Sequence, residues 1–106
     1  MGGSGTWDLV TRCPELFAAA VPICGGADET VGWKIAQLPI WCFQGAKDEV
    51  VHPNLSRHMI AAIKRAGGAP RYTEFPEAGH NILPLVIAET ELLTWLFAHH
   101  LSPASP

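Results

Sequence analysis

Two runs of apolar residues in the first half of the chain have the length and the flanks of buried strands. The first covers residues 16–23 and is followed by two glycines, and the second covers residues 38–44 and ends at Gly45. The second run does not alternate between polar and apolar residues, which is typical of a parallel strand covered on both faces. Residues 71–75 alternate more clearly, so we expect a third strand there, nearer the edge of the sheet.

Apolar residues at helical spacing predict helices between and around these strands. The clearest helix covers residues 53–66, because Pro53 suits a first turn, Lys64 and Arg65 suit a last turn, and two glycines follow. A helix is also expected over residues 5–13, ending before Pro14, and an amphipathic helix over residues 84–99. Residues 28–36 are predicted to form a loop with one helical turn.

Strands that alternate with helices along a chain predict an α/β architecture with a parallel sheet. We therefore expect about three parallel strands with flanking helices. A chain of 106 residues allows one domain at most, since a domain takes roughly 100–200 residues. That unit is expected over residues 1–100, and the Pro- and Ser-rich residues 101–106 are predicted to be a disordered tail.

Composition argues against several classes of function. The chain has 7 basic and 10 acidic residues and a net charge of −3, which does not favour nucleic-acid binding. No apolar run reaches the roughly 20 residues of a membrane span, and no signal peptide is apparent, so the compartment stays open. Three cysteines without a C-x-x-C pair predict neither a disulfide framework nor a zinc site, and no metal or organic cofactor is expected.

The candidate chemistry lies on the loops that follow the second and third predicted strands. Asp48 is on the first of these loops and His80, preceded by Gly79, is on the second. Functional groups in open α/β sheets gather at the carboxyl ends of strands, and an acid followed by a histidine is the order found late in a serine-hydrolase triad. In such a triad the carboxylate orients the imidazole, and the imidazole takes the proton of the serine hydroxyl. Glu49 is the neighbouring alternative to Asp48.

Five stretches together resemble one family in their order along the chain. They are M-G-G-S-G-T-W-D-L, F-A-A-A-V-P-I-C-G-G, L-P-I-W-C-F-Q-G-A-K-D-E-V-V, R-Y-T-E-F-P-E-A-G-H-N and L-L-T-W-L-F. The chain resembles the C-terminal half of an α/β-hydrolase, within the group of esterases, predicted peptidases and polyhydroxybutyrate-depolymerase-like proteins. The resemblance implies a serine hydrolase acting on a small or polymeric carboxylic ester.

The same resemblance implies roles for individual residues. Asp48 would be the orienting acid, His80 the base, and Met1 the residue that supplies one backbone donor of the oxyanion hole. The nucleophilic serine would stand immediately before Met1, so the isolated chain is expected to lack triad-dependent activity. Ser4 does not replace it, because the nucleophile motif needs a glycine two residues later, where this chain has Thr6.

Substrate-pocket candidates are Trp33, on the loop before the second strand, and Gly25 and Gly26, which follow the first strand. Nothing in these residues names a substrate.

Two other functions stay open. The chain could be a non-catalytic α/β module with a vestigial site that self-associates, because a three-strand sheet leaves an unpaired edge. A flavodoxin-like ligand binder would also fit the order of elements, but a phosphate-cradling loop after the first strand is missing. The expected partners are therefore an N-terminal hydrolase half or a second copy of the chain, with no nucleic acid and no membrane.

Overall fold

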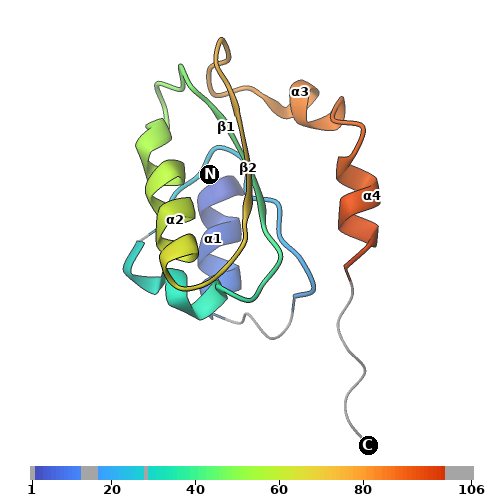
Figure 1. The fold of residues 1–106 in the computed structure, drawn as a ribbon. Coiled ribbons are helices and arrows are strands. Elements are labelled where there is room, and N and C mark those ends of the chain that lie inside the picture. Colours follow the sequence, from blue (N-terminus) through green and yellow to red (C-terminus); the bar gives the residue numbers. More distant parts are fainter. Residues whose placement is uncertain (1, 13–16, 28, 100–106) are drawn as a thin grey trace, which may run out of the picture.

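The computed structural model describes residues 2–12, 17–27 and 29–99 of the chain (Figure 1). Within these residues the strands and helices alternate, as the sequence predicted. The elements are α1 (Gly2–Arg12), the 3-10 helix η2 (Glu29–Ile35), β1 (Trp41–Gly45), α2 (Pro53–Arg65), β2 (Arg71–Phe75), α3 (Leu83–Ile87) and α4 (Leu92–Phe97).

The sheet is parallel. β1 pairs with β2 in a register that sets Trp41 opposite Arg71 and Gly45 opposite Phe75. Residues 20–24 run parallel to the other edge of β1, where bridges join Ala20 to Ile40 and Ile23 to Phe43. The first strand predicted from the sequence, residues 16–23, overlaps this segment, but the segment forms only isolated bridges, so the regular sheet in the described residues has two strands and not three. Pro22 lacks the N–H that would point at β1, so one ladder hydrogen bond is missing at its centre.

Helices cover both faces of β1, and all five of its residues are buried. On one face Cys42 packs with Trp7 of α1 and Met59 of α2, and on the other Trp41 and Phe43 pack with residues from the C-terminal part of the chain, among them Ile82, Val86 and Trp95. Figure 1 shows α1 and α2 on one side of the strands and α3 and α4 on the other. The prediction of a central strand buried on both faces is confirmed.

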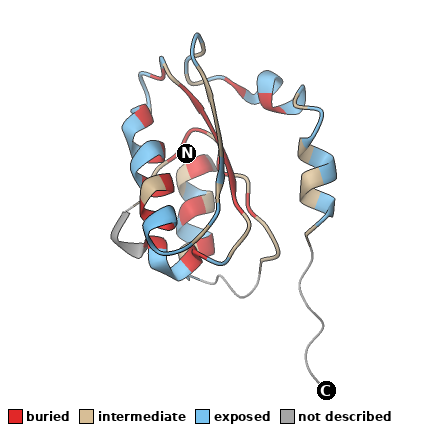
Figure 2. Cartoon of the chain, in the orientation of Figure 1, coloured by how far each residue is buried: buried red, intermediate tan, exposed pale blue. Residues whose placement is uncertain are grey.

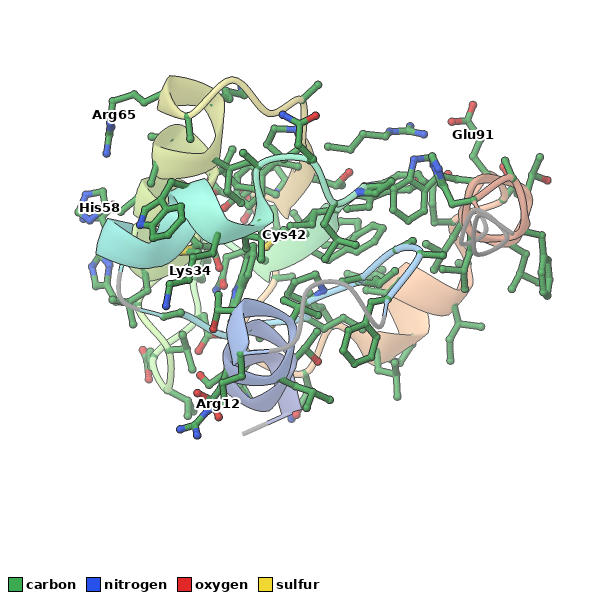
Figure 3. All side chains as sticks on the ribbon, turned by 90° about the horizontal axis from the view of Figure 1, so that it is seen from below. Arg12, Lys34, Cys42, His58, Arg65 and Glu91 are labelled. Atoms are coloured by element: carbon green, nitrogen blue, oxygen red, sulfur yellow. The ribbon has the colours of Figure 1, made fainter. Side chains whose placement is uncertain are left out.

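Polar side chains lie at the outside of this arrangement. Figure 3 shows Cys42 in the interior, whereas Lys34, His58 and Arg65 project from the periphery. No helix in residues 2–12, 17–27 and 29–99 is long and apolar enough to cross a membrane.

The prediction of one helix over residues 84–99 is wrong, because the structure has α3 and α4 with a break between them. In the break, the Glu89 carboxylate accepts the Glu91 N–H at 3.2 Å. Such a local bond offers the backbone an alternative to the helical ladder, and the β-branched Thr90 adds little to helix stability. Figure 2 shows α4 with no buried residue.

Helix α1 begins earlier than predicted, at Gly2, and η2 fills most of the loop predicted over residues 28–36. The predicted tail, residues 101–106, lies outside the described part of the chain.

Candidate active site

The loop after β1 holds the carboxylate of Asp48 in place. Asp48 is 5% exposed, and its Oδ1 atom accepts the backbone N–H groups of Val50 and Val51, both at 2.8 Å. A side-chain oxygen that binds N–H groups two and three residues ahead makes a stable turn. The sequence therefore folds this loop around the carboxylate.

Gln44 connects Asp48 to the core. It is fully buried in β1, and its Nε2 group lies 3.1 Å from Asp48 Oδ2 and 3.3 Å from the Val51 carbonyl oxygen. Its Oε1 atom accepts the Ser56 hydroxyl of α2 at 2.8 Å. The sequence interpretation did not single out Gln44. The signal was an amide inside an otherwise apolar strand, since a buried polar group needs partners.

His80 reaches Asp48 from the loop after β2. Its Nδ1 atom lies 2.9 Å from Asp48 Oδ2, and its side chain is 30% exposed. An ionised carboxylate can only accept hydrogen bonds, so Nδ1 donates and Nε2 is left as the acceptor. The structure thus brings together the two residues predicted as acid and base, and Glu49 is exposed on the same loop.

The two loops touch because Gly45 has no side chain. A Cβ atom on Gly45 would lie 2.0 Å from the Gly79 carbonyl oxygen and 2.6 Å from that of Ala78. Lys47 N–H donates to the Ala78 carbonyl oxygen at 2.9 Å, which ties the loops together. Gly45 therefore positions His80 against Asp48.

Hydrogen bonds keep Asp48 ionised. Its burial works to raise the pKa, but the N–H of Val51, the His80 ring, the N–H of Val50 and the Gln44 amide all stabilise the carboxylate. The net result is a pKa of Asp48 below its ordinary value. A permanently charged acid is what orients and stabilises a histidine that must accept a proton.

Cys24 completes the inner face of the site. Its Sγ atom lies 3.2 Å from the His80 carbonyl oxygen and can donate to it, and its backbone has φ of 52°, unusual for a residue other than glycine. Burial, and more weakly the charge of Asp48, raise the pKa of the thiol, while a hydrogen bond from the Gly45 backbone opposes the change. Sequence reasoning treated Cys24 only as one of three cysteines without a C-x-x-C pair.

A cavity of about 460 Å³ opens beside His80. It is bounded by α1, by the outer edge of residues 21–24 and by the residues that follow His80. The lining includes Gly3, Thr6, Val21, Ile23, Cys24 and His80.

The other predicted site residues lie apart from this cavity lining. Gly25 packs against the backbone of Gly3 and Ser4, and Gly26 packs against Leu55, so both are sites of close approach. Ser4 is part of α1, and its Oγ atom accepts the Gly26 N–H at 3.2 Å. Trp33 is 68% exposed, with the Lys34 ammonium 5.7 Å from its ring.

The roles of Trp33, Gly25 and Gly26 in substrate binding stay predictions. Met1, the expected oxyanion donor, lies outside the described residues.

Solved structures similar to this one include an esterase and a thioesterase. A thermostable esterase shares 37% identity and a TM-score of 0.87, with 92% of this chain and 28% of that chain covered. Acyl-protein thioesterase 2 of Zea mays has 23% identity and a TM-score of 0.63, covering 77% of this chain and 40% of its own. SOBER1 of Arabidopsis thaliana has 18% identity and a TM-score of 0.71, covering 91% and 48%. The chain thus spans less than half the length of each. No protein-family model and no curated protein matches it.

Proposed function

The chain belongs to the α/β-hydrolase superfamily, and we propose that it supplies the acid and the base of a serine hydrolase that cleaves carboxylic esters. The observation that carries the proposal is the 2.9 Å contact between Asp48 and His80 at the carboxyl ends of neighbouring parallel strands. The similarity to a thermostable esterase supports the choice of an ester as substrate.

In the proposed mechanism Asp48 holds the His80 ring so that Nε2 faces an incoming hydroxyl. Nε2 takes the proton of a serine as its oxygen attacks the ester carbonyl, and it later returns the proton to the leaving alcohol. The carboxylate of Asp48 stabilises the imidazolium formed between these steps. Gln44 and the two backbone N–H groups hold the carboxylate still during this exchange.

We propose further that the nucleophile is none of the described serines and that the isolated chain is inactive. The hydroxyl of Ser4 is engaged by Gly26, and that of Ser56 lies buried against Gln44 and Gly25. The cavity beside His80 supports a nucleophile carried by another segment. Val21 and Ile23 line this cavity, and they alternate with Ala20, Pro22 and Cys24, whose backbones bond to the β1 side. The backbone N–H and C=O groups of Val21 and Ile23 therefore face away from β1 and could pair with one more strand.

A chimera tests the proposal directly. This chain would replace the matching segment of the thermostable esterase, and hydrolysis of p-nitrophenyl acetate would be measured. We expect activity in the chimera, and a fall of about 10⁴-fold in kcat for Asp48→Asn, because the histidine then takes the wrong tautomer. Glu49→Gln is the matched control and should keep the activity.

The isolated chain provides the second arm of the test. It should neither hydrolyse the ester through the triad nor react stoichiometrically with a fluorophosphonate probe. Labelling of Ser4 would contradict the assignment of the nucleophile. Full activity of the Asp48→Asn chimera would contradict the role of the acid.

Exposed apolar side chains favour self-association as a second candidate function. Leu83 and Ile87 of α3 and Leu93 and Phe97 of α4 are 55–79% exposed. Both helices therefore present exposed apolar surface, which is typical of a contact surface. We propose that copies of the chain bind through it, and light scattering over a range of concentrations tests this. A mass that stays monomeric at all concentrations would reject it, and Phe97→Asp should lower the average mass if it is correct.

A further inference from the structure

Three side chains of types that can ligate metals lie close together in the candidate active site. The ligand atoms of Cys24, Asp48 and His80 all lie within 4.8 Å of one another. Within residues 2–12, 17–27 and 29–99 this is the one group of three or more such side chains that could share an ion. They come from three separate segments, after residues 20–23, after β1 and after β2, so the convergence is a product of the fold.

From this geometry we propose that Cys24, Asp48 and His80 form a site for a thiophilic divalent cation, Zn²⁺ or Cd²⁺. Thiolate, imidazole and carboxylate are all established zinc ligands. The Cys24 thiolate would select soft ions over Mg²⁺ and Ca²⁺, which prefer oxygen ligands alone.

The distances fit such an ion after small movements. Zinc binds sulfur at about 2.3 Å and nitrogen or oxygen at about 2.0–2.2 Å, so neighbouring ligand atoms in a tetrahedron lie about 3.3–3.8 Å apart. Asp48 Oδ2 and His80 Nδ1 are 2.9 Å apart, and no pair in the group exceeds 4.8 Å. Shifts of about 1 Å or less would therefore bring the three atoms to coordinating distance.

Charge and access also suit an ion. Binding releases the Cys24 proton to solvent, and the thiolate and the Asp48 carboxylate then balance the two charges of the cation in a largely buried site. Cys24 and His80 both line the cavity of about 460 Å³, which leaves room for a water molecule at a fourth position. Three protein ligands and one open position is a common arrangement for zinc.

A cation bound at this site would prevent His80 from acting as a base, a consequence that rests on the proposed function. An ion bound to His80 Nδ1 and to Asp48 replaces the hydrogen bond between them, and the proton of the neutral ring moves from Nδ1 to Nε2. The ring then cannot accept the proton of a nucleophile in the required orientation. Removal of the ion by a chelator would restore the hydrogen bond.

Titration of the 106-residue chain with Cd²⁺ tests the site without any measurement of activity. We expect one ion per chain and an ultraviolet thiolate-to-cadmium charge-transfer band. Cys24→Ser keeps a donor to the His80 carbonyl oxygen but removes the soft ligand, so the band should disappear and the affinity should fall at least about tenfold. Cys42→Ala and Cys13→Ser are the matched controls and should keep the band.

Histidine NMR gives an independent readout on the unmodified chain. Cd²⁺ should shift the ring signals of His80 and leave those of His52 and of the peripheral His58 in place. A band that survives Cys24→Ser would overturn the proposal. So would an ion that moves only the signals of histidines other than His80, a result that is decisive even if the serine variant does not fold.

Inhibition is then measured in the esterase chimera. Zn²⁺ should abolish ester hydrolysis and a chelator should restore it, with each variant compared with its own activity before addition of the ion. An inactive chimera would reject the proposed function, while the cadmium titration still decides the metal site. A bound ion without inhibition would overturn the regulatory part of the proposal.

Discussion

Gly45→Ala is the substitution that most directly tests how the site is built. The new Cβ atom would meet the Gly79 carbonyl oxygen at 2.0 Å, and Cβ atoms do not approach other atoms within 3.0 Å. The loop that carries His80 must therefore move back by about 1 Å or more. Because His80 Nδ1 and Asp48 Oδ2 are 2.9 Å apart, a shift of that size breaks their hydrogen bond.

The cost in folding free energy follows from the same contacts. Overpacking in a tight site costs about 1–3 kcal/mol. The bonds from Lys47 N–H to Ala78 and from Ala46 N–H to Phe75 join the two loops, and each is worth about 0.5–1.5 kcal/mol. We therefore expect a loss of about 2–6 kcal/mol in the free energy of unfolding, a large share of the roughly 5–15 kcal/mol of a typical domain.

Urea unfolding measures this loss, and the NMR signal of the His80 Nδ1 proton reports the contact with Asp48. Gly79→Ala is the matched control, since a Cβ atom there meets nothing nearer than the Lys47 carbonyl oxygen at 3.9 Å. It should change the stability by less than about 0.5 kcal/mol. A Gly45→Ala variant with unchanged stability and an intact Nδ1 proton signal would refute the reasoning.

Three further predictions follow from individual contacts. Gln44→Leu should lower the free energy of unfolding by about 2–4 kcal/mol, measured with urea, because Asp48 and Ser56 lose a buried partner; a change below about 0.5 kcal/mol would contradict this. Because the pKa of Asp48 is lowered in the folded state, its carboxylate stabilises the fold at any pH above the ordinary pKa of an aspartate. This stabilisation is lost as the pH falls through the lowered pKa of the folded state. The melting temperature should therefore fall less between pH 7 and pH 2 for Asp48→Asn than for the natural chain. Equal falls in the two proteins would argue against this role of Asp48. Gly67→Ala should cost about 1–2 kcal/mol, because φ of 94° after α2 is strained for any side chain, whereas Gly5→Ala, in open space within α1, should be neutral or stabilising.

The secondary structure was predictable wherever a local signal was strong. Pro53 and the glycines after residue 66 bound α2, and β2 begins and ends where the alternation does. The last helix was not predictable in the same way. Val86 and Leu93 are seven residues apart, a helical spacing that spans residues 88–91, while the backbone breaks there around the Glu89 side chain. A hydrophobic pattern reports which face can be buried, but not whether the backbone stays continuous beneath it.

Asp48 and His80 could be chosen from the sequence because loops after parallel strands meet at one edge of a sheet. Residue type and position along the chain made them candidates, and the resemblance to α/β-hydrolases favoured Asp48 over the neighbouring Glu49. Gln44, Gly45 and Cys24 could not be chosen, because their significance depends on residues far away in the chain. Gly45 matters for its approach to Gly79, and Cys24 for its contact with His80, 56 positions later.

The sequence by itself therefore determined the α/β class, the parallel sheet and the placement of Asp48 and His80 on loops at its carboxyl edge, since the alternation of strands and helices follows from local propensity and periodicity. Only the tertiary structure decided how closely the loops approach, which groups hold the carboxylate, and that a thiol lies against the acid and the histidine. Such distances depend on the packing of three segments at once. No local pattern encodes them.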